Sequence, residues 1–148
     1  MLDRELNRAL AAAVREQASD HEVAVIVLDG GEVARLLGRR RGRGPRARKI
    51  EGMLEDFHGA IRALWDAECV TVAAIHGFAM GGGLELALAA DLIVAESNAR
   101  LGFPEIALGC YPPVAAAILA ARVGPALANE LVLTGESFTP DRASRWAC

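Results

Sequence analysis

Long apolar runs and paired cysteines are both missing from this sequence of 148 residues. No apolar stretch reaches the roughly 18 residues that a membrane-spanning helix needs, and the charged N-terminus lacks the apolar core of a signal peptide. The three cysteines, Cys69, Cys110 and Cys148, are odd in number and have no CxxC spacing, which disfavours a disulfide framework and a zinc site. We therefore expect a cytoplasmic protein with no metal and no membrane contact.

Aromatic residues are also scarce, at 5%, yet apolar residues reach 53%, so Ala, Leu and Val must supply most of the core. This composition excludes a disordered chain and fits one domain with an α/β interior. Short β-branched runs alternate with helical periodicities, and the wholly apolar runs predict parallel strands buried on both faces. The predicted strands are 23–28, 70–75 and 92–95, and the predicted helices are 2–14, 50–65 and 84–89, followed by a helical part marked by prolines over 112–148.

One short segment carries half of the positive charge. Residues 35–49 hold eight of the 16 Lys and Arg residues and no acidic residue, whereas the whole chain has 19 Asp and Glu. The segment has neither helical nor strand periodicity, so we expect a solvated, disordered loop. A nucleic-acid-binding arm is the alternative. It is disfavoured because the segment lacks interleaved aromatic residues and the rest of the chain is acidic.

The stretch HGFAMGGGLE, residues 76–85, follows a predicted strand and opens a predicted helix. Three adjacent glycines let the backbone approach a ligand closely, and a helix N-terminus presents unpaired N–H groups. The pattern is neither GxGxxG nor GK[ST], which disfavours a dinucleotide site and a P-loop. Taken alone, the stretch is equally well explained as a tight strand-to-helix turn.

Two glutamates near this turn lie among apolar neighbours. Glu85 stands in the run LELALAADL, and Glu105 follows Pro104 in FPEI. Apolar surroundings raise the pKa of a carboxyl group, which suits general acid or base catalysis. The alternative, that each is only a helix-start acid or a solvated loop charge, stays open on these residues alone.

The whole stretch HGFAMGGGLELALAADLIVAESNARLGFPEIALG resembles the signature of the enoyl-CoA hydratase/isomerase (crotonase) superfamily. The glycine triplet, the glutamate two places after it, the A-D-L strand and the P-E-I segment occur in family order and spacing. Weaker similarity extends over residues 2–34 and 50–146. The resemblance implies an α/β fold, a crotonase-type spiral of ββα units that forms trimers or dimers of trimers. The loop at 109–116 is similar to that of the cyclic dienoyl-CoA hydratase branch.

The resemblance also implies an activity on acyl-CoA thioesters, in fatty acid or aromatic acid degradation. By position, it makes Gly82 an oxyanion-hole N–H donor, and Glu85 and Glu105 the pair that adds water across the α,β double bond. Double-bond isomerisation is the alternative within the family. Coenzyme A is then part of the substrate, and no cofactor is permanently bound. The implied substrate contacts are Ala79, Gly81, Gly82, Pro104, Glu105 and Leu108.

Residues 35–48 do not match the A-F-S-A-G-x-D segment that supplies the family's second oxyanion donor. Displaced by one base, the codons of Arg35 through Arg39 can encode Ala-Phe-Ser-Ala-Gly, so we hypothesise a reading-frame slip that is reversed near Lys49. The segment as written could instead contact the phosphates of coenzyme A. Loss of one donor costs orders of magnitude in rate, so we expect poor activity from the chain as written.

The family's opening strands and later C-terminal helices have no counterpart in the sequence. We therefore expect residues 1–148 to be a single partial crotonase-like domain, incomplete at both ends. Within it, 35–49 is the anomalous Arg-rich loop and 112–148 is the start of the C-terminal helical part. A catalytically inactive fragment that only associates with full-length relatives is the non-enzymatic alternative.

Overall fold

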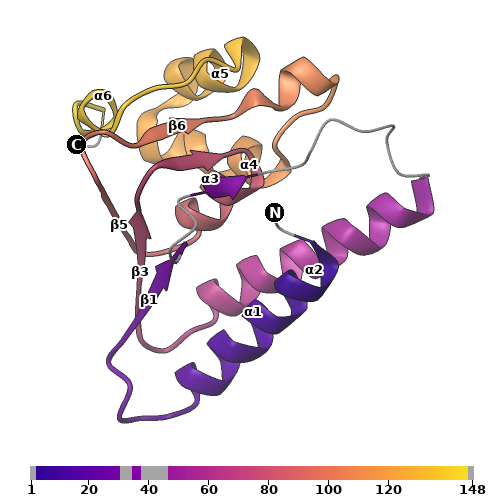
Figure 1. The fold of residues 1–148 in the computed structure, drawn as a ribbon, viewed down its shortest axis with the longest axis vertical. Coiled ribbons are helices and arrows are strands. Elements are labelled where there is room, and N and C mark those ends of the chain that lie inside the picture. The colour runs from indigo at the N-terminus through magenta and orange to yellow at the C-terminus, as the bar shows by residue number, and fades with distance from the viewer. Residues whose placement is uncertain (1–2, 31–34, 38–46, 147–148) are drawn as a thin grey trace.

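A computed structural model describes residues 3–30, 35–37 and 47–146, and Figure 1 traces its helices and strands. The helices are α1 (Arg4–Ala18), α2 (Ala47–Trp65), α3 (Gly82–Leu88), the 3₁₀ helix η1 (Pro104–Leu108), α4 (Pro113–Val123), α5 (Pro125–Thr134) and α6 (Pro140–Ser144). The strands are β1 (Val25–Asp29), β2 (Arg35–Leu37), β3 (Val70–Ile75), β4 (Phe78–Met80), β5 (Leu92–Ala95) and β6 (Arg100–Gly102).

The six strands form two parallel sheets, in the orders β1-β3-β5 and β2-β4-β6. Consecutive strands alternate between the sheets, and a helical segment follows each pair, so that every ββα unit adds one strand to each sheet. Gly77, with a φ of 66°, makes the bend between β3 and β4. The predicted spiral of ββα units is confirmed.

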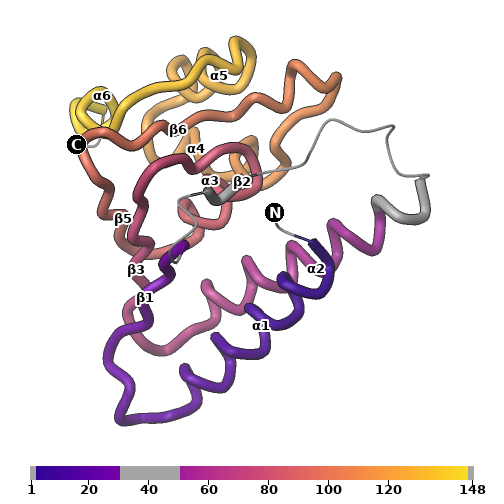
Figure 2. Tube along the Cα trace, in the orientation of Figure 1, coloured from indigo at the N-terminus to yellow at the C-terminus, as the bar shows by residue number. Residues whose placement is uncertain are grey.

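Helices α1 and α2 lie side by side and run in the same direction beside the first sheet (Figures 1 and 2). The carboxylate of Asp3 caps α1 by accepting a 2.9 Å hydrogen bond from the backbone N–H of Leu6. Asp56 of α2 pairs with both Arg4 and Arg8 of α1, which ties the polar edges of the two helices together. A first cluster of buried side chains involves these two helices, and its members include Ala11, Val14, Phe57, Ala60, Ile61 and Leu64.

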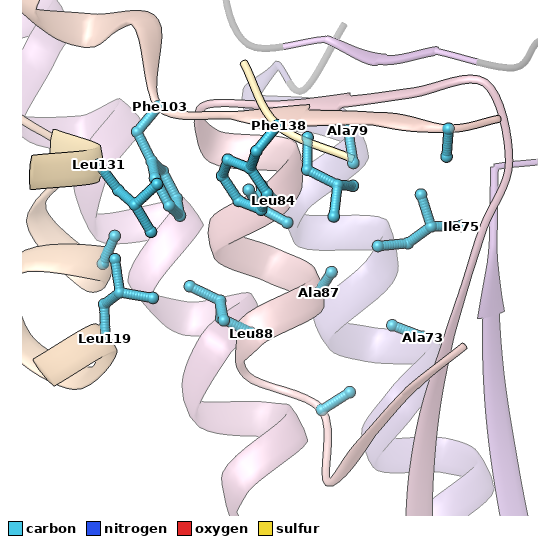
Figure 3. Close-up of a cluster of buried hydrophobic side chains, with 14 of the residues drawn as sticks. Ala73, Ile75, Ala79, Leu84, Ala87, Leu88, Phe103, Leu119, Leu131 and Phe138 are labelled. Atoms are coloured by element: carbon cyan, nitrogen blue, oxygen red, sulfur yellow. The ribbon is translucent and has the colours of Figure 1, made fainter. Parts of the chain in front are cut away.

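The second cluster of buried residues lies between α3, the sheets and the C-terminal helices, and Figure 3 shows its side chains. Phe103 has no exposed surface and packs in the same cluster as Leu131 and Phe138. Leu101 of β6 exchanges backbone hydrogen bonds with Phe138, at 2.9 and 2.8 Å. The helical part predicted after residue 112 is therefore packed on the end of the spiral.

One expectation about burial is wrong. The strand at 23–28 was expected to be buried on both faces, yet Val25 and Val27 are 50% and 59% exposed. The described helices cover only the opposite face, which carries Ile26 and Leu28. Trp65, the last residue of α2, is 53% exposed although it continues the apolar periodicity of that helix.

The expectation of a loop throughout 35–49 is also wrong at both ends. Strand β2 pairs with β4, with Leu37 opposite Met80, and α2 already begins at Ala47. Three residues are too few to show a period, and the pairing uses backbone groups that every sequence carries. The hypothesis of a frame slip concerns mainly residues 38–46, which lie outside the described part of the chain.

Candidate active site

The carboxyl ends of three parallel strands meet at one edge of the second sheet. Leu37 of β2, Met80 of β4 and Gly102 of β6 are in register, and the backbone N–H of Gly81 donates to the carbonyl of Gly102 at 2.9 Å. The chain continues from β4 into the glycine turn and from β6 into η1, so Glu85 and Glu105 arrive at the same edge. Ligand sites in open parallel sheets commonly lie at this edge.

Gly81 makes the turn between β4 and α3. Its φ of 56° falls in the left-handed region, which glycine adopts without strain. A side chain at this position would also collide with the carboxylate oxygen Oε1 of Glu105. Gly82 is the first residue of α3, where backbone N–H groups have no partner within the helix.

The side chain of Glu85 is buried, with 3% of the residue exposed. Its Oε1 accepts hydrogen bonds from the backbone N–H groups of Val114 and Ala115, at 2.7 and 3.0 Å. Burial raises the pKa of Glu85 to about 7, and the nearby Glu105 adds a smaller upward effect, while the two backbone hydrogen bonds oppose both. The side chain of Glu85 is therefore fixed in place, and its pKa of about 7 lets the carboxyl group gain or lose a proton near neutral pH.

Glu105 lies in η1 directly after Pro104 and is partly buried. Burial raises the pKa of its carboxyl group as well. Its Oε2 is buried and has no hydrogen-bond partner. A buried carboxylate oxygen without a partner is costly, so this atom is poised to meet a ligand or a water molecule.

A cavity of about 370 Å³ brings the two glutamates together with the glycine turn. Five of the six predicted substrate contacts line it: Gly81, Gly82, Pro104, Glu105 and Leu108. Ala79 does not line this cavity; it is fully buried in the hydrophobic core beside Leu84. Further lining residues that the sequence did not reveal are Asn7, Met53, Leu54, Phe57, Met80 and Tyr111.

Two other residues with reactive side chains lie at or near strand ends and turns. Cys110 is exposed and lines the cavity together with Glu105. The Nε2 atom of His76 lies 3.2 Å from Oδ1 of Asp29 at the ends of β3 and β1. Among the described residues, no group of three or more His, Cys, Asp or Glu side chains could hold a metal ion.

The parallel spiral and the two acids beside a glycine turn are the features that the family resemblance implies, and the sequence comparisons agree on the family. The pattern of the family described as Enoyl-CoA hydratase/isomerase matches residues 1–147. A probable enoyl-CoA hydratase of Rhizobium meliloti is 38% identical over 141 residues, which are 95% of this chain and 55% of that protein. The chain belongs to the enoyl-CoA hydratase/isomerase family.

Solved structures support the same assignment. A family member from Silicibacter pomeroyi superposes with a TM-score of 0.85 at 25% identity, over 99% of this chain and 63% of that one. The chain thus spans little more than half the length of the relatives it matches. None of the described helices combines the length and apolarity that a transmembrane span requires.

Two relatives with different names match the chain about equally well. Cyclohexa-1,5-dienecarbonyl-CoA hydratase of Thauera aromatica is 41% identical over 86 residues, 58% of this chain and 33% of that protein. Carnitinyl-CoA dehydratase of Proteus mirabilis is 43% identical over 84 residues, 56% of this chain and 32% of that protein. The similarity to the cyclic dienoyl branch is therefore shared with a second branch.

Proposed function

We propose that this chain carries the site of an enoyl-CoA hydratase, which adds water across the α,β double bond of an acyl-CoA thioester. The observation that carries the proposal is the pair Glu85 and Glu105, both with raised pKa values, in one cavity with the glycine turn. The backbone N–H of Gly82 would hold the thioester oxygen as negative charge develops on it. Coenzyme A enters and leaves as part of substrate and product.

The two carboxyl groups suit a reaction that takes up one proton and releases another. Charge on Glu105 disfavours charge on Glu85, so the pair favours holding one carboxylate and one carboxylic acid. The carboxylate takes a proton from water while the water oxygen bonds to Cβ. The carboxylic acid gives its proton to Cα, and the negative charge on the thioester oxygen returns to the carbonyl. The product is a 3-hydroxyacyl-CoA.

The roles of the two glutamates follow from their partners. Glu85 is held in place by two backbone donors, and its pKa of about 7 suits a group that takes up a proton at neutral pH, so we assign it the base. Glu105 has an unpartnered oxygen, so we assign it the acid. Strand β2 lies beside β4, and a backbone donor after Leu37 would need no particular side chain. That residue lies outside the described part of the chain, so the second donor and the poor activity expected without it are left to the assay.

The assay uses the purified chain with crotonyl-CoA and with a cyclic dienoyl-CoA. Hydration removes the absorbance of the conjugated thioester, and we expect slow turnover that Glu85→Gln and Glu105→Gln each lower by at least 100-fold. A 3-enoyl-CoA tests the alternative, because double-bond isomerisation creates this absorbance. No turnover above background with any of the three substrates would favour the inactive fragment instead.

We also propose, from the resemblance, that the chain associates with copies of itself or with full-length relatives as a trimer or dimer of trimers. Light scattering of the purified chain, alone and mixed with a full-length relative, measures the assembly directly.

The proposal includes no nucleic acid partner. Unchanged mobility of RNA and DNA fragments at low salt is the expected control result, since electrostatic binding is strongest there.

A further inference from the structure

Asn7 is out of place on the buried side of α1. The residues of this helix that are buried are Asn7, Ala11 and Val14, which lie on one face at helical spacing. Asn7 is only 1% exposed, and its Oδ1 is buried without a hydrogen-bond partner. A buried amide oxygen without a partner costs free energy that a leucine at the same position would not. A ligand that supplies the missing hydrogen bond would explain why the amide is there.

The cavity offers a place for such a ligand. Asn7 lines the same cavity as Glu85 and Glu105, but it comes from α1 and not from the glycine turn. The lining residues of the neighbouring α2, which are Met53, Leu54 and Phe57, are apolar. A molecule bound with its reacting carbons at the glutamates would therefore meet apolar side chains on these two helices and a single amide among them.

We propose that Asn7 determines the specificity of this cavity, and that the acyl group it accepts carries a hydroxyl group remote from the thioester. The inference rests on the proposed function, since it takes the thioester to lie at Gly82. A hydroxyl group satisfies the amide because it can donate to Oδ1. A purely hydrocarbon acyl group leaves Oδ1 unpaired, and a site built to hydrogen-bond a polar group discriminates against the analogue that lacks it.

The test measures binding without turnover. Saturated thioesters cannot be hydrated, so hexanoyl-CoA and its 4-, 5- and 6-hydroxy derivatives are titrated calorimetrically into the wild-type chain. We expect one hydroxy derivative to bind about tenfold more tightly than hexanoyl-CoA, the effect of one buried hydrogen bond. In Asn7→Leu and Asn7→Ala the ratio of the two dissociation constants should fall below twofold, whereas Leu6→Ala, at an exposed position of the same helix outside the cavity lining, should keep it.

The outcomes separate the two proposals. If hexanoyl-CoA and all its hydroxy derivatives bind wild type equally, or if Asn7→Leu keeps the preference, the role of Asn7 is overturned and the proposed function stands. If no thioester binds the wild-type chain, the proposed function fails and this inference fails with it. A purely structural Asn7 would change the stability of the fold but not the ratio of the two dissociation constants.

Discussion

At the scale of single residues, Glu85 couples the chemistry of the cavity to the stability of the fold. Its folded pKa of about 7 exceeds the ordinary value of 4.5, so the folded chain binds this proton more tightly than the unfolded chain does. The contribution to stability is complete below pH 4.5. It is lost as the pH rises through 7, because ionised Glu85 must then be kept away from water.

Glu85→Gln separates these two effects. Gln keeps a side-chain oxygen for the N–H groups of Val114 and Ala115 but cannot ionise. We expect the free energy of unfolding to vary less between pH 4.5 and 7 in the variant, and to exceed that of wild type at pH 8 by on the order of 2 kcal/mol. Urea unfolding at pH 5, 6, 7 and 8 measures this. An unchanged pH dependence in Glu85→Gln would contradict the burial argument.

Gly81 is the residue whose replacement should disturb the site most directly. Ala at position 81 would adopt an unfavourable positive φ and would push the carboxylate of Glu105 out of place. Gly124 is a matched control, because its φ is 82° and a side chain there meets nothing within 4 Å. We expect each Ala variant to lose about 1–2 kcal/mol of stability through backbone strain. Only Gly81→Ala should also lose binding of acyl-CoA; equal binding in both variants would show that the contact with Glu105 is unimportant.

At the scale of elements, a polar junction between buried Thr71 and exposed Asp91 joins β3 to the start of β5. Thr71 is 1% exposed, and both its N–H and its hydroxyl donate to Oδ2 of Asp91 at 2.8 Å. The N–H of Asp91 donates back to the Thr71 hydroxyl at 3.0 Å. These bonds hold the pKa of the Asp91 carboxyl below its usual range, so it is the carboxylate form of Asp91 that accepts them.

Thr71→Val keeps the shape of the side chain and removes the hydroxyl. Two hydrogen bonds are lost at a buried position, so we expect the free energy of unfolding to fall by about 1–3 kcal/mol. Thr134→Val is the control, because the Thr134 hydroxyl bonds to the carbonyl of Glu130 on an exposed helical turn and should matter by no more than about 0.5 kcal/mol. Thermal unfolding of both variants measures the difference. Equal losses would show that the junction contributes nothing beyond an ordinary surface bond.

The sequence predicted the longer elements well and the shorter ones poorly. The strands at 70–75 and 92–95 and the proline-marked helix starts agree with the structure, because apolar runs and prolines act locally. Strands β2, β4 and β6 have three residues each, too few to show an alternation. They form because parallel neighbours pair with them, which is a tertiary effect.

The same contrast holds for the site. The resemblance pointed to the glycine turn and the two glutamates, and the structure brings them to one cavity. Asn7 was missed because apolar residues of the first helix also occupy exposed positions, such as Leu6 and Ala9. Alanines occur on every side of this helix, so the pattern alone did not select the buried face. Packing against α2 selects it.

At the scale of the whole molecule, the helices of the described part of the chain leave one face of the first sheet uncovered. Val25 and Val27 of β1, Val70 of β3, and Leu92 and Val94 of β5 alternate onto this face and are 44–62% exposed. Surface residues in contact with solvent are ordinarily polar. A contiguous exposed apolar face of this kind therefore binds hydrophobic dyes and lowers solubility. This chain spans 55% of the length of one relative, so that relative has segments without a counterpart here.

Replacing two of these residues should reduce the effect without breaking the sheet. Val27→Thr and Val94→Thr together keep branched side chains, which strands favour, while placing two hydroxyl groups on the face. We expect the fluorescence of bound 8-anilinonaphthalene-1-sulfonate to fall by about half and the solubility limit to rise. Leu133→Gln, at an exposed apolar residue of α5 that is 66% exposed, is the control and should change neither quantity. If the control matches the double variant, or if the double variant behaves as wild type, the dye and the low solubility report on another surface.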